Sequence, residues 1–143
     1  MKQFILTVKN MIKLRSFNTN LYRFLYKECD VNIIRTSMVD KAWIYWFNDG
    51  SIREIMIGKM RNREEVISAL LHEVGHYKDI KKLGPVRFKR MPMKEQERSA
   101  WKWAIKFSKQ YDLEMDYQIS VEWLGTYKAS YRCLENLASN QSR

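Results

Sequence analysis

The sequence predicts an α+β domain in which a three-stranded sheet, including one hairpin, packs on a long central helix and is followed by further helices. Two patterns support this prediction. Apolar residues recur every three or four positions over residues 19–29, 62–82 and 94–111, as they do along one face of a helix. Short β-branched and aromatic runs lie between the first two of these segments, and Asp49-Gly50 separates two of the runs.

The composition fits one soluble domain. The chain has 143 residues, of which 45% are hydrophobic, enough for a single core over residues 1–143. Residues 1–15 are expected to form an extra amphipathic helix, a strand or an arm, and residues 139–143 a frayed tail. No apolar run is long enough to span a membrane, and the N-terminal run is too short and too charged for a signal peptide. We expect a cytoplasmic protein with Cys29 and Cys133 reduced.

The elements that precede the central helix follow from caps and turn residues. A first helix is expected from Asn18 or Thr19 to Cys29, because Asn and Thr are good N-caps. Asp49-Gly50 is expected to supply the left-handed residues of a tight hairpin turn. Strands are expected at residues 31–36, 42–47 and 51–57.

The central helix has the clearest boundaries. Asn62 is a good N-cap, and the glutamates that follow it suit the positive end of the helix dipole. Its buried stripe is expected to be Val66, Ile67, Leu70, Val74 and Tyr77. Gly84 is a suitable residue after the C-cap, and Pro85 should prevent continuation. Residues 84–93 then read as a basic loop, before helices at residues 94–111 and 121–138.

The central helix carries a His-Glu-x-x-His motif whose histidines, His72 and His76, are the only two in the chain. Residues four apart share a helix face, so both imidazoles can offer a nitrogen to one zinc ion, with Glu73 as a base. The alternative is two surface histidines that fall four apart by chance. Gly75 costs about 1 kcal/mol relative to alanine within a helix, which predicts that a neighbouring backbone approaches closely there.

Catalytic zinc usually has three protein ligands, and the chain has no third histidine. Asp79 and Lys82 stand where the metzincin pattern requires glycine and histidine, so that class is excluded. The third ligand should therefore be an acidic residue from a later element.

Glu95 and Glu97 are both available for this role. Glu95 falls on a solvated helix face, whereas Glu97 falls on the buried face with its small residues. That second face comprises Ala100, Trp101, Ala104 and Phe107 or Ser108. Glu97 is the better ligand candidate, and the alternative is a first-turn glutamate favoured by the helix dipole.

Residues 71–76 and 97–105 resemble the ImmA/IrrE-like zinc metallopeptidases. Their pattern is His-Glu-x-Gly-His followed by Glu-x-x-Ala-Asn/Asp-x-aromatic-Ala, and the resemblance covers roughly residues 18–110. It implies a zincin-like fold with one zinc ion per chain. Trp101 replaces the usual Asn or Asp, and the Leu-Leu-Met-Pro-like stretch after the second motif is absent. These departures concern substrate recognition rather than the ligand set.

By this resemblance, His72, His76 and Glu97 would be the zinc ligands and Glu73 the general base. The expected activity is a zinc metalloendopeptidase that cleaves a specific cytosolic protein. Many members of the family are encoded by phages and mobile elements and act on a helix-turn-helix repressor, so a DNA-binding repressor is the implied substrate. The strand at residues 51–57 is expected to be an edge that holds the substrate in extended form.

Two other function classes fit the sequence. The formal charge is +10, from 26 Lys and Arg against 16 Asp and Glu, which attracts polyanions and acidic proteins. The main alternative is therefore a non-proteolytic module of the same fold that binds a repressor or nucleic acid. A weaker alternative is a small toxin or inhibitor directed at a host protein. Tyr77 or Tyr111 could donate to the reacting oxygen, but Tyr77 falls on the buried stripe, and the predicted site includes neither.

Overall fold

The computed structural model describes residues 4–5, 19–40, 42–47, 49–59 and 62–115. Most of the N-terminal segment predicted at residues 1–15, the helix predicted at 121–138 and the tail lie outside the described residues.

The described chain has the predicted α+β class. Its elements are β1 (Phe4–Ile5), α2 (Thr19–Glu28), β2 (Ile33–Asp40), β3 (Ala42–Trp46), β4 (Ile52–Lys59), α3 (Arg63–Leu83), α4 (Pro85–Arg90) and α5 (Met93–Tyr111). The three predicted strands are present as β2, β3 and β4. The two-residue β1 pairs with β2 and adds a short fourth strand to the three that were expected.

The sheet is mixed, with the strand order β1-β2-β4-β3. β2 runs parallel to β4, with Ile33 opposite Ile55, and β3 runs antiparallel to β4. β4 therefore lies inside the sheet, so the expectation that residues 51–57 form an edge strand is wrong. Among the described strands, β3 forms one edge of the sheet and the two-residue β1 the other, because β2 pairs with the returning arm of the hairpin rather than with β3.

The hairpin turn departs from the prediction in one detail. The backbone N–H of Phe47 donates to the carbonyl of Ser51 over 2.8 Å and closes the loop. Gly50 has φ 87°, whereas Asp49 does not have a positive φ. Asp49 instead accepts the backbone N–H of Ser51 with its side chain, over 2.9 Å. The aspartate acts through its carboxylate and only the glycine supplies the left-handed conformation.

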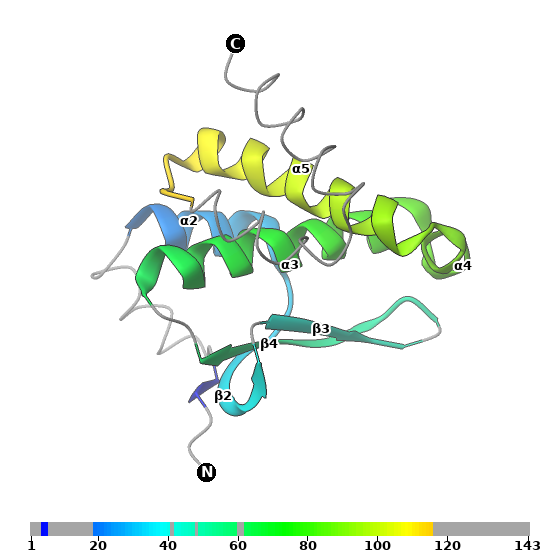
Figure 1. Ribbon diagram of the computed structural model, residues 1–143, viewed down its shortest axis with the longest axis horizontal. Helices are drawn as coiled ribbons and strands as arrows, with labels where there is room; N and C mark the ends of the chain where they lie inside the picture. Colours follow the sequence, from blue (N-terminus) through cyan, green and yellow to red (C-terminus); the bar gives the residue numbers. More distant parts are fainter. Residues whose placement is uncertain (1–3, 6–18, 41, 48, 60–61, 116–143) are drawn as a thin grey trace.

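α3 begins and ends as predicted but is buried more widely. The side chain of Asn62 accepts the backbone N–H of Glu65 over 2.9 Å, and Gly84 follows the helix with φ 83°. Figure 1 shows the sheet on one side of α3 and α5 on the other, with α2 beside α5. Because α3 lies between two layers, every residue from 67 to 76 is buried, which is more than the predicted stripe, whereas Val66 and Tyr77 of that stripe are only half-buried.

The segment predicted as a basic loop contains the short helix α4. Pro85 is its first residue, where proline's missing N–H costs nothing and its fixed φ suits a helix. Proline thus ends α3 as expected and also starts the next helix. Phe88 is buried and packs edge-on against Trp46 of β3, with ring centroids 5.5 Å apart.

The core lies between α3, the sheet, α2 and α5. Phe24 of α2 is fully buried and its ring contacts both Phe107 and Tyr111 of α5. Cys29 is a free thiol whose pKa burial raises to about 11, while Cys133 lies outside the described residues. Among the described helices, none combines the length and the apolar character that crossing a membrane requires.

Candidate metal centre

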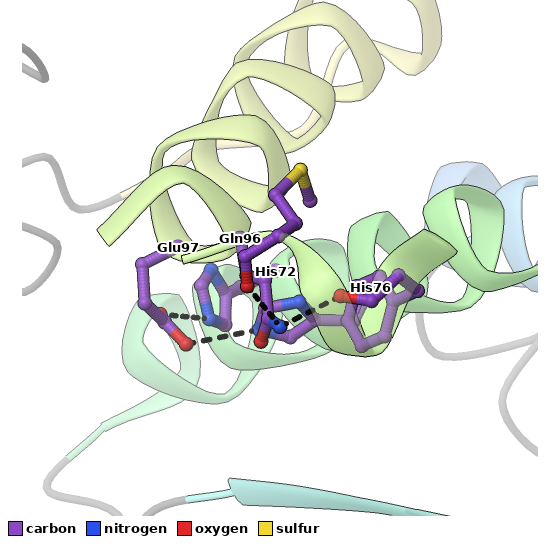
Figure 2. A network of polar contacts seen from close by, with 6 residues as sticks. His72, His76, Gln96 and Glu97 are labelled. Carbon is purple, nitrogen blue, oxygen red and sulfur yellow. Dashed lines mark hydrogen bonds and ion pairs between the residues drawn. The ribbon is translucent and has the colours of Figure 1, made fainter. Parts of the chain in front are cut away.

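Two imidazoles and one carboxylate converge between α3 and α5. His72 and His76 lie one turn apart on α3, and Glu97 reaches them from α5 (Figure 2). The Nε2 atom of His72 lies 2.9 Å from Oε2 of Glu97, and the Nε2 atom of His76 lies 3.1 Å from Oε1. The structure thus brings together the three residues that the sequence singled out as ligands.

A backbone contact between the two helices allows this convergence. A Cβ atom added to Gly75 would lie 2.6 Å from the carbonyl oxygen of Ala100 and 3.0 Å from its Cα. No side chain fits in that space, so the predicted close approach at Gly75 is confirmed. Because the helices meet at this point, Glu97 on the second turn of α5 comes within reach of both histidines.

Gln96 joins the start of α5 to the end of α4. Its side-chain amide Nε2 donates to the backbone carbonyl of Phe88 and to that of Met91, each over 2.9 Å. Figure 2 draws these two bonds as dashed lines from Gln96. These carbonyls lie at the C-terminal end of α4, where that of Phe88 also accepts the backbone N–H of Met91 over 3.1 Å. Gln96 therefore fixes the corner from which the neighbouring Glu97 projects.

The acid and base properties of the cluster are coupled. Burial by itself raises the pKa of Glu97, but the charge of His72 and the hydrogen bonds from both imidazoles outweigh it, so the pKa lies well below its usual value. Burial disfavours a charged His76, but the hydrogen bond to Glu97 and the nearby carboxylates outweigh it and raise the pKa. Glu97 and His76 therefore stabilise each other's charged forms.

Glu73, the glutamate of the His-Glu-x-x-His motif, is 5% exposed. Burial raises its pKa above the usual value, and this effect outweighs the attraction of the two histidines. A carboxylate with a raised pKa is a better proton acceptor near neutral pH than an ordinary surface glutamate. Glu73 thus has the environment of a general base next to the two imidazoles.

The three converging residues suit a metal ion. One ligand atom from each of His72, His76 and Glu97 can be chosen so that all three lie within 4.8 Å of one another. A tetrahedral ion bonded at roughly 2.0–2.2 Å holds its ligand atoms roughly 3.4 Å apart, so only small side-chain movements are needed. Two imidazoles and one carboxylate suit several divalent transition metals, and the donor set alone does not select one of them.

Ring packing orients the imidazoles. The ring of His72 lies 4.1 Å from that of Trp101, and the ring of His76 lies 6.1 Å from that of Phe88. The Nδ1 atoms of both histidines are buried and lack a hydrogen-bond partner within the described ranges. In many metal sites a hydrogen bond at this atom fixes the ring. Here aromatic contacts hold the Nε2 atoms toward Glu97.

Sequence reasoning missed both of these aromatic residues as parts of the site. The sequence predicts Trp101 on the buried helix face with Glu97 and marks it as a departure from a family pattern, but it does not predict a contact with His72. Phe88 fell in a segment predicted to be a loop. The sequence feature that could have identified Trp101 is its position one turn after the ligand Glu97. No sequence feature pointed to Phe88.

Three residues that the sequence analysis excluded from the predicted site also lie outside the cluster in the structure. Glu95 is exposed, in agreement with the choice of Glu97. The hydroxyl of Tyr111 donates to Glu28 of α2 over 2.5 Å, which occupies it elsewhere in the fold. Tyr77 is half-buried and contacts the Lys81 ammonium through its ring.

Comparisons with models of protein families, with curated proteins and with solved structures gave no significant match to this chain.

Proposed function

We propose that this protein is a zinc metallopeptidase in which His72, His76 and Glu97 bind the ion. The observation that carries the proposal is the convergence of both histidine Nε2 atoms on one carboxylate, within 3.1 Å. Glu73 lies in the same motif, buried and with a raised pKa. The resemblance of residues 71–76 and 97–105 to the ImmA/IrrE-like family supports the same reading.

Zinc bound by these residues would supply a Lewis acid that polarises a substrate carbonyl and lowers the pKa of water. Glu73 would accept the proton of the attacking water and pass it to the nitrogen of the departing amine. Its raised pKa suits the first step, because a carboxylate with a raised pKa binds a proton more readily. Trp101 and Phe88 would keep the two imidazole rings in position during the reaction.

The substrate would be bound as an extended segment along β3. This strand packs on α3 and is one of the two edges of the sheet in the part of the chain that the structure describes. An edge strand offers unpaired N–H and C=O groups to a peptide. The proposed substrate class is a cytosolic protein, and the family resemblance favours a helix-turn-helix repressor, as in phages and mobile elements.

The test compares wild type with Glu73→Gln and with Glu95→Gln as a matched control. Each purified protein is assayed for zinc by elemental mass spectrometry. Each is then co-expressed with the product of the neighbouring gene, and new N-termini are sought by mass spectrometry. We expect about one zinc ion per chain in all three proteins, and cleavage by wild type and Glu95→Gln only.

Two results would contradict the proposal. Cleavage by Glu73→Gln at the wild-type rate would exclude Glu73 as the general base. Wild type that binds no zinc when the ion is supplied in excess would remove the metal site itself. Full zinc binding with no cleavage of any partner would instead favour the non-proteolytic binding module.

A further inference from the structure

The solvent face of α5 carries a continuous row of positive charge. Four residues at spacings of three or four lie on this face and are all exposed: Arg98, Lys102, Lys106 and Lys109. We call this row the α5 ridge. The sequence contains no Asp or Glu from residue 98 to residue 111. α5 carries its two acidic residues, Glu95 and Glu97, before Arg98, so the stretch that holds Lys102, Lys106 and Lys109 has no Asp or Glu of its own.

A groove beside the ridge extends the positive surface to α3. It has a volume of about 530 Å³ and is lined by Lys82 of α3 and by residues of α5 that include Lys102 and Lys106. At 1.5 Å per residue, the ridge from Arg98 to Lys109 is about 16 Å long. Positive charge therefore continues beyond the groove along the helix, which favours an extended anion over a small one.

The inner wall of the groove is formed by a fixed pair of side chains. The indole Nε1 of Trp103 donates to Oδ1 of Asp79 over 2.9 Å, and Asp79 is 5% exposed. The Lys106 ammonium lies 5.0 Å from the centre of the Trp103 ring. Because the only carboxylate in the groove lies at its base, anionic groups are expected at the rim, near the lysine ammonium groups.

We propose that the α5 ridge and Lys82 bind the phosphodiester backbone of a nucleic acid. One DNA strand carries a charge every 3.4 Å, so a ridge of about 16 Å spans about five phosphates. Protein interfaces usually require aromatic or apolar anchors. The large exposed hydrophobic residues of the described chain include none between residues 98 and 111, which favours nucleic acid over an acidic protein. Lysine contacts to phosphates position a protein without reading base sequence.

The test reverses charge on the ridge and, as a control, on another helix. Lys102→Glu/Lys106→Glu changes two exposed residues four apart on α5, and Arg23→Glu/Lys27→Glu changes an equally spaced exposed pair on α2. Binding to a labelled DNA duplex, a DNA single strand and an RNA strand of equal length is measured by fluorescence anisotropy at several salt concentrations. Circular dichroism verifies that each variant is folded.

We expect the ridge variant to bind at least tenfold more weakly than wild type at about 0.1 M salt, and the α2 variant to change by less than threefold. The slope of log affinity against log salt should fall by about 2 for the ridge variant only, since each lost phosphate contact removes roughly 0.9 from a duplex slope. The relative affinities of wild type for the three probes then identify which nucleic acid is preferred.

Three outcomes would overturn the proposal. Equal weakening by both double variants would mean that the net charge attracts nucleic acid without a defined surface. Unchanged binding by the ridge variant would place the contact elsewhere. Tighter binding of polyglutamate than of any nucleic acid, lost in the ridge variant, would assign the ridge to an acidic protein.

Discussion

Gly75 of α3 lies against the backbone of Ala100 of α5, so closely that a Cβ on Gly75 would be 2.6 Å from the Ala100 carbonyl oxygen. This contact sets the separation of the two helices that carry the metal centre. His72 and His76 lie on either side of Gly75 in the chain, and Glu97 precedes Ala100 by one turn. The glycine of the His-Glu-x-Gly-His sequence thus allows the two helices to approach closely, because it has no side chain.

Gly75→Ala should destabilise the fold, although alanine is the better helix former. Helix propensity alone would add about 1 kcal/mol of stability. The added methyl group meets backbone rather than a flexible side chain, so the helices must separate, at a cost of about 2–3 kcal/mol. The expected net loss of about 1–2 kcal/mol can be measured by urea unfolding. A gain in stability would show that α3 and α5 do not meet at this point.

Glu97→Gln should weaken metal binding on the order of 100-fold or more. Losing an outer-shell partner commonly costs 10–100-fold, and the loss of a ligand should exceed that. Glu95→Gln, an exposed change two residues away, is the control and should bind as wild type. Zinc affinity is measured by competition with a chromogenic chelator. Equal affinities of the two variants would exclude Glu97 as a ligand.

Gln96→Ala should affect both the fold and the site. It removes two hydrogen bonds to the carbonyls of Phe88 and Met91, which we expect to cost about 1–2 kcal/mol of unfolding free energy. Because the α4–α5 corner then loosens, zinc affinity should also fall, by a few-fold to tenfold. Gln110→Ala changes an exposed glutamine of the same helix and should alter neither quantity. Chemical unfolding and chelator competition measure the two effects.

Tyr111→Phe should change how stability depends on pH at alkaline values. Burial, the hydrogen bond to Glu28 and the charge of Glu28 raise the pKa of Tyr111 to about 12. Since an unfolded tyrosine has a pKa near 10, the stabilisation is fully present below about pH 10 and is lost as the pH rises to about 12. The variant should lack this loss and be about 1–2 kcal/mol less stable at pH 7.

Thermal unfolding between pH 7 and pH 12 measures this prediction. Tyr26→Phe is the control, because Tyr26 is 71% exposed on the neighbouring helix α2. If wild type, Tyr111→Phe and Tyr26→Phe show the same pH dependence, then the bond between Tyr111 and Glu28 does not contribute to stability.

Some features of the site were predictable because they depend on local periodicity. A spacing of four places His72 and His76 on one face of any helix, and the apolar period of residues 97–107 separates Glu97 from Glu95. The caps at Asn62 and Gly84 were predictable for the same reason, since capping involves residues close in sequence.

Strand pairing was not predictable in this way. β4 pairs in parallel with β2, across β3 in the sequence, so the hairpin's returning strand lies inside the sheet and β3 becomes an edge. α4 was also missed, because Pro85 ends one helix and starts another, and the burial of Phe88 and the Gln96 bonds to the end of α4 are tertiary contacts.

The sequence by itself determined the helix that carries His72 and His76 and the acidic residue that faces the same side, because both follow from a period of 3.6 residues. The tertiary structure alone decided that Glu97 reaches both imidazoles, that Trp101 and Phe88 hold the rings, and that β3 is an edge strand. These depend on how closely Gly75 and Ala100 approach and on which strands pair, and such contacts join residues far apart in the chain.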